Sequence, residues 1–394
     1  MTEKAVIAGV GMTPFVKAGA GDPYDVIGAE AARRALADAG LEYSAVQRAY
    51  AAYIYGDSTS GQRALYRVGR TGIPIFNVNN NCSSGSTALF LAREAVESGA
   101  VDVALAVGFE QMVKDGEGRW PERPMTLEAF AIPPIEKYGM PETTAGAGLM
   151  YGAAGRQYAE EHGTDPTVFA RIAVKNRRHG VHNPYAQFQQ AVTLEEVLAS
   201  RPIYDPLTMF QCCPMTTGAA AAVVVSKSFA RRAGIRADVE IAAQSLVSDT
   251  DSTFTGDLVK LVGFDVTAAG AAEVYEKSGI GPEEIRVAEV HDCFTVHEFL
   301  IYEALGLTPV GTAEKFVLEE QNTYGGQVVV NPSGGLISCG HPIGATGLRQ
   351  CAELVWQLRG EAGARQVEGV DVALQHNMGM GSALVTTMYQ KVAA

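Results

Sequence analysis

Three short stretches of the sequence carry the residue types that could perform covalent catalysis. The first is 79–89, where Cys82 lies between an apolar segment, 73–78, and a segment with helical periodicity, 88–98, that ends at Gly99. We predict a short buried strand, a tight turn and a helix. Cys82 then lies at a helix N-terminus, where unpaired N–H groups and the helix dipole favour the thiolate. A cysteine so placed is a candidate nucleophile, and the alternative is a buried structural cysteine.

The other two stretches supply partners for a cysteine nucleophile. In 289–295 an apolar strand ends in His291, Asp292 and Cys293, and the glycine-rich loop 331–347 presents His341 just ahead of a helix. A single histidine is more often structural than catalytic. His341, however, occupies in a second copy of a repeat the place that Cys82 occupies in the first, which favours the catalytic interpretation.

The repeat is visible in two segments that recur in the same order. Residues 40–50, between a helix end and a strand, resemble 279–290, and 101–105 (Val-Asp-Val-Ala-Leu) recurs unchanged as 370–374 after another helix, 348–359. Together with a strand at 5–10 and a helix at 24–39, these echoes predict a duplicated α/β unit. We expect mixed sheets covered by helices, with the reactive loops at strand ends. Between the halves, 114–152 is rich in proline and glycine and predicts a long surface excursion, followed by helices near 151–162 and 166–176.

Composition excludes several classes of protein. The formal net charge of −13 argues against nucleic acid or an anionic membrane as the main partner. The six cysteines have no metal-finger spacing, and no apolar run reaches membrane-spanning length. Without a secretory pattern or a Ser-Lys-Leu terminus, we expect a soluble, cytoplasmic protein that neither inserts into membranes nor binds nucleic acid.

Four motifs in order resemble the thiolases. They are 81–85 (Asn-Cys-Ser-Ser-Gly), 291–294 (His-Asp-Cys-Phe), 340–347 (Gly-His-Pro-Ile-Gly-Ala-Thr-Gly) and 379–381 (Gly-Met-Gly). The chain further resembles the sterol-carrier-protein-2-type thiolases, also described as lipid-transfer-protein-like acetyl-CoA acetyltransferases. The segments that carry this resemblance are His-Asp-Cys-Phe, 183–188, 211–214 and 374–377. The resemblance implies an α/β thiolase fold with two duplicated βαβαβαββ halves stacked as a five-layer α-β-α-β-α sandwich with an inserted loop domain. The expected boundaries are 1–112 with 205–238, the insertion 113–204, and 239–394.

The resemblance also implies roles for the reactive residues. Cys82 would attack a 3-oxoacyl-CoA, His341 would take its proton, and His291 would donate to an oxyanion. Cys293 would exchange a proton with the acetyl carbon, since the usual cysteine near the last glycine loop is replaced by 375–377 (Gln-His-Asn). The backbone N–H groups of Cys82 and Gly381 would form a second oxyanion hole.

Coenzyme A is the expected cosubstrate, with no permanently bound cofactor and no metal. The candidate CoA-binding residues lie in the densest basic run, which is alternatively a solvated helix face: Arg171, Lys175, Arg178 and His182. Cys339 is either part of the site or merely tolerated there. We expect Cys212, Cys213 and Cys351 to face the core. The resemblance further implies a homodimer or a dimer of dimers, paired across the first-half sheet.

The leading hypothesis is thiolytic cleavage of 3-oxoacyl-CoA, giving acetyl-CoA or propionyl-CoA and a shortened acyl-CoA, with reverse condensation possible in principle. A decarboxylating ketoacyl synthase is the first alternative, because Cys82, His291 and His341 match its Cys-His-His set. A thiolase-fold aldolase acting on a CoA-linked steroid side chain is the second, and the presence of Cys82 argues against it. A non-catalytic lipid-binding subunit would have no need of these reactive residues.

Overall fold

The sheet of the protein is built from two halves with the same strand order. The computed structural model describes residues 3–112, 127–140, 146–381 and 383–392. The first half runs β4 (Ile75–Val78), β3 (Arg48–Ala52), β5 (Val103–Glu110), β8 (Thr216–Ser226) and β1 (Ala5–Met12). The second runs β11 (Val329–Val330), β10 (Val287–Glu289), β12 (Val372–Gly379), β13 (Ala383–Lys391) and β9 (Val239–Val247).

Strand directions follow the same order in both halves. In the first half, β4, β3 and β5 are parallel to one another, β8 is antiparallel to β5, and β1 is antiparallel to β8. In the second half, β11, β10 and β12 are parallel to one another, β13 is antiparallel to β12, and β9 is antiparallel to β13. A pairing between Val6 of β1 and Glu240 of β9 joins the halves. The duplicated unit predicted from the repeated segments is therefore confirmed.

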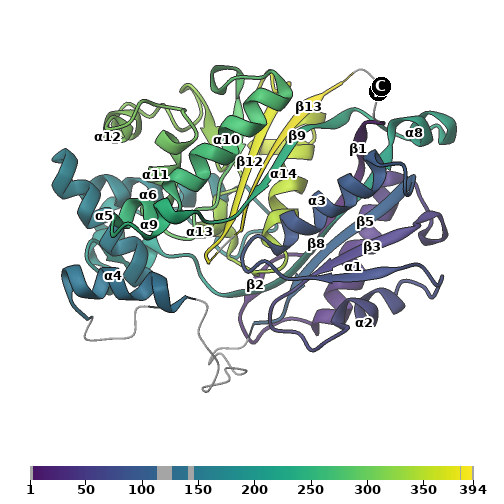
Figure 1. Cartoon of the computed structure of the whole chain (residues 1–394), viewed down its shortest axis with the longest axis horizontal. Coiled ribbons are helices and arrows are strands. Elements are labelled where there is room, and N and C mark those ends of the chain that lie inside the picture. Colours follow the sequence, from purple (N-terminus) through teal and green to yellow (C-terminus); the bar gives the residue numbers. More distant parts are fainter. Residues whose placement is uncertain (1–2, 113–126, 141–145, 382, 393–394) are drawn as a thin grey trace.

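Two helices lie side by side between the halves and form the central layer. They are α3 (Ser84–Glu97) and α14 (Thr346–Arg359), which pack on each other and on strands of both halves (Figure 1). Apart from Trp356, every residue of α14 is buried. The outer faces are covered by α1 (Tyr24–Ala39) on β1 and β8, and by α10 (Phe264–Ser278) on β9 and β13. This gives the predicted α-β-α-β-α order, in which strands covered on both faces are buried along their whole length, as β1, β5 and β8 are.

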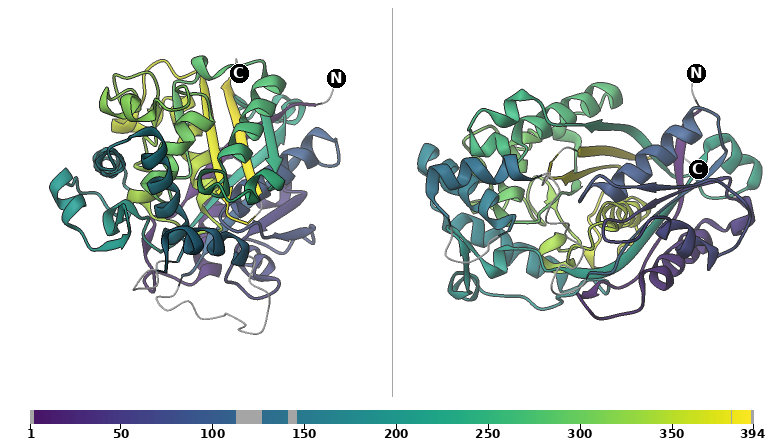
Figure 2. Two further views of the ribbon diagram at one scale, coloured as in Figure 1. Left: turned by 60° about the vertical axis from the view of Figure 1, so that its left-hand side comes forward. Right: turned by 60° about the horizontal axis from the view of Figure 1, so that its bottom comes forward.

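The segment between β5 and β8 forms a helical insertion that rests on the second half, seen in teal in both views of Figure 2. It contains α4 (Glu128–Tyr138), α5 (Gly148–His162), α6 (Thr167–Gly180), α7 (Leu194–Ala199) and the small sheet of β6 (Pro202–Tyr204) and β7 (Leu207–Thr208). Tyr151 and Phe169 of the insertion share one core with Phe299 of α11 (Thr295–Ala304). Part of the predicted excursion, 113–126 and 141–145, lies outside the described residues.

The remaining short elements connect these layers. They are β2 (Val16–Lys17), η1 (Tyr43–Ala45), α2 (Ser60–Tyr66), η2 (Met209–Gln211), α8 (Lys227–Ala233), η3 (Asp251–Phe254), α9 (Leu258–Leu261), η4 (Pro282–Glu284), α12 (Ala313–Leu318), α13 (Gly335–Cys339) and η5 (Gly363–Arg365). In the described part of the chain, no helix is long and apolar enough to cross a membrane.

One strand differs from its prediction. The segment before Cys82 was predicted to be buried, but β4 is the edge strand of the first half, and Phe76 on it is 48% exposed. The apolar pattern alone did not show that this strand has a neighbour on one side only.

Candidate active site

Cys82 lies on a strained turn between β4 and α3. Asn81 has a φ of 49°, in the left-handed region that non-glycine residues rarely adopt. Hydroxyl groups hold the turn, since Ser83 Oγ donates to Asn80 O at 2.8 Å and Ser84 Oγ donates to Asn81 O at 2.7 Å. The turn places Cys82 just ahead of the first residue of α3, as the sequence predicts.

Glycines let the neighbouring loops come close to this turn. A Cβ on Gly379 would lie 2.2 Å from the backbone oxygen of Asn80, and one on Gly85 would lie 2.8 Å from that of Gly344. The strand end at 379 and the loop that carries His341 therefore pack directly against the Cys82 turn. Glycine is needed there for close approach of the backbones.

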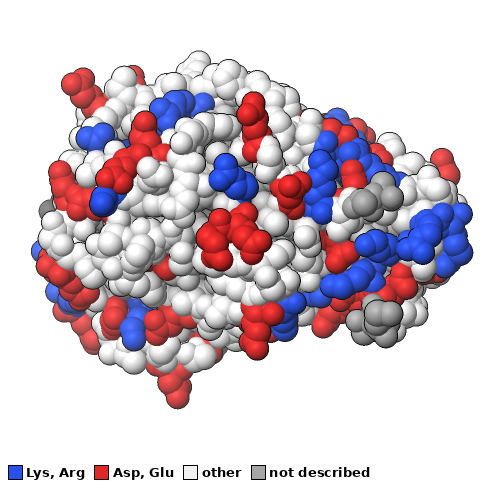
Figure 3. Space-filling model, turned by 90° about the horizontal axis from the view of Figure 1, so that it is seen from above, with Lys and Arg blue, Asp and Glu red and all other residues white. Residues whose placement is uncertain are grey.

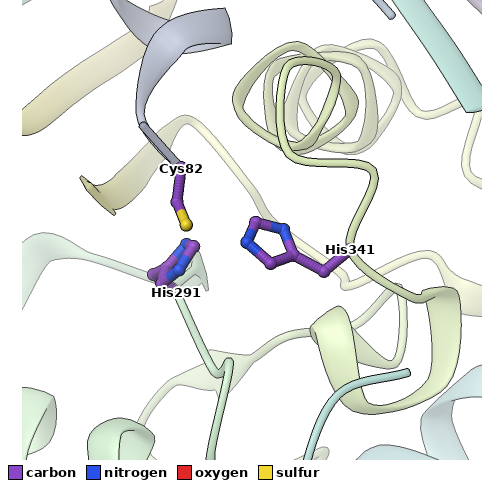
Figure 4. A group of neighbouring side chains, drawn as sticks. All are labelled: Cys82, His291 and His341. Atoms are coloured by element: carbon purple, nitrogen blue, oxygen red, sulfur yellow. The ribbon is translucent and has the colours of Figure 1, made fainter. Parts of the chain in front are cut away.

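The structure brings Cys82, His291 and His341 together from three separate elements. The Sγ of Cys82 and one ring nitrogen of each histidine lie within 4.8 Å of one another (Figure 4). Cys82 precedes α3, His291 follows β10, and His341 lies between α13 and α14. The three side chains and Cys293 line one cavity of about 250 Å³.

His341 is arranged as a base. Its Nδ1 lies 2.7 Å from Thr346 Oγ1, and that hydroxyl donates to the Pro342 carbonyl at 3.0 Å. Since the single hydroxyl hydrogen goes to the carbonyl, the oxygen must accept from His341 Nδ1–H. The proton of the neutral ring is then on Nδ1, and Nε2 is bare. In the described structure, this buried Nε2 has no hydrogen-bond partner.

His291 is arranged as a donor. The Asn377 side chain accepts from Ser86 Oγ through Oδ1 at 2.8 Å and donates through Nδ2 to the Cys82 carbonyl at 3.2 Å. The same Nδ2 lies 3.0 Å from His291 Nδ1. His291 Nδ1 is therefore an acceptor, and the ring proton is on Nε2. The two histidines thus carry opposite tautomers around one sulfur.

This assignment argues against a metal centre, although one cysteine and two histidines at this spacing are a familiar ligand set. A ligating nitrogen must be free of its proton. His291 Nε2 carries one, and releasing it would require the Asn377 amide to turn away from both the Cys82 carbonyl and the Ser86 hydroxyl. The donor set fits acid–base chemistry better than metal binding.

Burial keeps the resting site uncharged. It raises the pKa of the Cys82 thiol to about 12, with the Glu110 carboxylate adding to the effect. It lowers the pKa of His341 to about 3, and it lowers the pKa of His291 well below its usual value. Desolvation of the sulfur therefore opposes the thiolate that the helix N-terminus favours. The thiolate must form by transfer of the proton to a base.

The cavity is mainly apolar and includes a cysteine that we expected in the core. Besides the residues above, its lining comprises Tyr55, Asn81, Met112, Leu127, Ala147, Tyr151, Cys213, Pro214, Met215, Phe294, Ile343, Met378 and Met380. Cys213 packs against the core, as predicted, but it also lines the cavity. Its backbone N–H donates to the Cys293 carbonyl at 2.9 Å, so the two cysteines lie on neighbouring segments.

The other predicted residues lie away from the reacting sulfur. Cys339 is buried beside the Ser333 carbonyl, 3.3 Å from its Sγ, and is not among the residues that line the cavity. Cys351 is in the core, as expected. Asp292 accepts from the N–H groups of Leu336 and Ile337 and so caps α13. Gly381 has a φ of 85° at the turn after β12.

The candidate CoA residues lie on or just after α6, and two of them are already paired. Lys175 is buried and donates to the Glu298 carboxylate and to the Val330 carbonyl, so the proposal that it binds a phosphate is wrong. Arg171 and His182 are exposed, and Arg178 lies 3.6 Å from Glu320. Among the described residues, none of these four lines the cavity.

The surface charge is mixed rather than broadly basic. On the face in Figure 3, acidic and basic side chains alternate, and basic ones gather at the right-hand end, where α8 carries Lys227, Arg231 and Arg232. Two of these three are paired, Lys227 with Glu240 and Arg232 with Asp102. An anionic ligand would therefore depend on local contacts.

Sequence reasoning missed four residues that shape the site. Asn377 fixes the tautomer of His291, and Glu110 accepts from Gly344 N–H at 3.1 Å, which holds the His341 loop. Tyr151 and His297 lie against Cys293. His297 gave a signal, since it follows Cys293 by four residues, the spacing of one helical turn, and Asn377 belongs to the Gln-His-Asn motif, although no role was predicted for it. The others are brought in by the tertiary fold.

The fold and the site define a mixed α/β protein in which a candidate nucleophilic cysteine lies between two histidines. Residues 5–228 match the family described as thiolase, N-terminal domain, and 249–391 match the thiolase C-terminal domain-like family. The chain therefore belongs to the thiolase family. Within it, the chain is 51% identical to sterol carrier protein 2 of Oryctolagus cuniculus, over 98% of this chain and 72% of the relative.

Two further comparisons bear on chemistry. The chain is 37% identical to the benzoylsuccinyl-CoA thiolase subunit BbsB of Thauera aromatica, over 99% of this chain and 98% of the relative. Among solved structures, the Ltp2-ChsH2(DUF35) aldolase aligns with a TM-score of 0.84 at 26% identity, over 99% of this chain and 98% of that chain. Relatives of this chain are thus described as a carrier, a thiolase and an aldolase.

Proposed function

We propose that this protein is a thiolase that cleaves a 3-oxoacyl-CoA with free CoA. The products are acetyl-CoA, or propionyl-CoA from a 2-methyl substrate, and a shortened acyl-CoA. The observation that carries this proposal is the hydrogen-bonding around Cys82, which assigns opposite tautomers to His341 and His291. A bare His341 Nε2 suits removal of the thiol proton, and His291 Nε2–H suits an oxyanion.

In the first half-reaction, Cys82 Sγ attacks the 3-keto carbon while His341 Nε2 takes the thiol proton. The backbone N–H groups of Cys82 and Gly381 stabilise the resulting oxyanion. Collapse of this adduct breaks the C2–C3 bond and leaves an acyl thioester on Cys82. The departing electron pair forms the enolate of acetyl-CoA, to which His291 Nε2–H donates, and Cys293 protonates its carbon.

In the second half-reaction, the CoA thiol attacks the acyl group on Cys82. Its proton passes to the Cys293 thiolate, and the Cys82 sulfur leaves and recovers its proton from His341. Both thiols and the imidazole return to their starting states. Arg171, Arg178 and His182 remain our candidates for the CoA phosphates, and CoA is a cosubstrate, not a resident group.

An aldolase is the second candidate, because an aldolase structure aligns with the whole chain. The presence of Cys82 at the centre of the histidine pair favours acyl transfer, since an aldol cleavage has no need of an acyl-enzyme. A decarboxylating synthase and a lipid carrier are the remaining alternatives.

The experiment compares four assays on the purified protein: CoA-dependent cleavage of acetoacetyl-CoA and of a longer 3-oxoacyl-CoA, decarboxylation of malonyl-CoA, and release of a carbonyl compound from a 3-hydroxyacyl-CoA. We expect activity in the first two only, and at least a ~10³-fold loss in Cys82→Ala. Carbonyl release without thiolysis would establish the aldolase, and decarboxylation would establish the synthase. Binding of acyl-CoA without any turnover would leave a non-catalytic lipid carrier as the remaining function.

A further inference from the structure

Two side chains with no part in the scheme above hold the sulfur of Cys293. Cys293 lies between β10 and α11, and its Sγ is 3.7 Å from Nδ1 of His297, one turn into the helix. Tyr151, on α5 of the insertion, lines the same cavity as Cys293, and its hydroxyl lowers the pKa of the Cys293 thiol. Cys293 is therefore contacted from its own helix and from the inserted segment.

Packing fixes both contacts. Tyr151 and His297 are each 2% exposed, and their rings lie 4.9 Å apart between centroids. Tyr151 also stacks on Phe294 at 4.8 Å. Tyr151 and Cys293 line the cavity, whereas His297 lies behind the sulfur. Neither side chain has room for another rotamer without repacking this core.

The surroundings of Cys293 otherwise oppose its ionisation. Burial raises the pKa of its thiol well above the usual value, and electrostatic interactions with the neighbouring Cys82 and Asp292 raise it further. The Tyr151 hydroxyl and the Phe294 backbone N–H lower it. His297 also faces the rings of His291 and His376, each 5.8 Å away, and burial lowers the pKa of His297 to about 3, so its ring is neutral. A hydrogen-bond donor directed at this sulfur therefore stabilises the thiolate strongly, because the site is buried.

We propose that Tyr151 and His297 are positioning residues for Cys293, which hold its sulfur toward the substrate α-carbon and stabilise the thiolate that forms there. This inference rests on the thiolase function proposed above. When the C2–C3 bond breaks, its electron pair takes the proton of Cys293. The electrons of the S–H bond stay on the sulfur, which becomes a thiolate. Tyr151 O–H and His297 Nδ1–H then donate to it. The incoming CoA thiol returns the proton as it attacks the acyl group.

The test uses a reaction that needs Cys293 and the enolate donor His291 but no acyl group on Cys82, the exchange of acetyl-CoA methyl protons with deuterated water. We expect Tyr151→Phe and His297→Ala each to slow exchange at least about tenfold, as removal of a hydrogen bond to a charged group does. His297→Asn, whose amide nitrogen can replace Nδ1, should recover most of the rate. Tyr158→Phe is the matched control, since it removes a buried hydroxyl of α5 that bonds to Glu303 instead. Alkylation of Cys82 by iodoacetamide should be unchanged in all of them.

A second readout follows the thiol itself. In a Cys82→Ser background, alkylation of Cys293, resolved by peptide mass, should shift to higher pH in Tyr151→Phe and His297→Ala. Wild-type exchange rates with unshifted labelling in these variants would overturn the inference, as would equal losses in Tyr158→Phe. A wild type that neither cleaves nor exchanges would instead overturn the proposed function, and the labelling would still decide whether the two side chains act on Cys293.

Discussion

At the scale of single residues, the neutral Cys82–His341 pair has a direct consequence for reactivity. Burial holds the pKa of the thiol at about 12 and that of the imidazole at about 3, so the thiolate is scarce at neutral pH without substrate. Below its pKa the thiolate fraction grows about tenfold per pH unit. Iodoacetamide should therefore alkylate Cys82 about tenfold faster with each unit between pH 7 and 9. A plateau of the rate below pH 7 would show a resting thiolate–imidazolium pair and contradict this account.

Asn377 offers a test of the His291 tautomer. In Asn377→Asp, the carboxylate would accept a proton from His291 Nδ1 and leave Nε2 bare, so the enolate would lose its donor. We expect kcat to fall about a hundredfold or more, the usual effect of losing an oxyanion donor, with KM little changed. Asn377→Ala should show a similar loss without the added charge. Wild-type kcat in both variants would show that the tautomer of His291 is unimportant.

The residues predicted from the sequence are those whose neighbours carry local signals. Cys82 and His341 lie at turns marked by glycine and helix starts, and His291 and Cys293 follow an apolar strand, so their places could be predicted. Tyr151 lies inside a regular helix and nothing local marks it, while Asn377 lies in a recognised motif whose contact with His291 only the fold reveals. The burial of Lys175 depends on Glu298, 123 residues away. The resting charge of Cys82 depends on how deeply the whole fold buries it.

At the scale of elements, Gly379 is the point where β12 meets the Cys82 turn. Gly379→Ala would place a Cβ against the Asn80 carbonyl and displace the turn. We expect a loss of about 1–3 kcal/mol in the free energy of unfolding, typical of overpacking, together with a large fall in kcat. Gly40→Ala, at the left-handed end of α1, should cost about 1–2 kcal/mol without a change in kcat. Thermal unfolding and kcat are measured for both variants. A kcat of Gly379→Ala equal to that of Gly40→Ala would refute the close-contact role of Gly379.

The elements themselves were largely predictable because helix ends and the repeated segments carry strong local patterns. The helix 24–39 matches α1 in both bounds, since Gly40 ends it in the left-handed conformation. The repeat predicted equivalent halves, and their strand orders agree. The edge position of β4 was missed, because burial of a strand depends on its neighbours, which its own residues do not encode.

At the scale of the whole molecule, the exposed edge at β4 supports the expected dimer. An edge strand carrying a half-exposed Phe76 is a natural surface for pairing with a second copy. We expect sedimentation velocity to show a dimer or larger assembly for the wild type and a shift toward monomer for Phe76→Lys. Val310→Lys, at a 65% exposed apolar site in the second half, is the control and should leave the assembly intact. A wild-type monomer, or an unchanged assembly in Phe76→Lys, would place the interface elsewhere.

The proposed mechanism requires that Cys82 carry the acyl group, which intact-protein and peptide mass spectrometry can locate. The wild type is mixed with a 3-oxoacyl-CoA in the absence of free CoA, quenched in acid and digested. We expect the peptide with Cys82 to gain the mass of the shortened acyl group, one acetyl-CoA to be released per site, and added CoA to remove the acyl group. Consumption of substrate without acylation of Cys82, or an acyl group on another residue, would contradict the account.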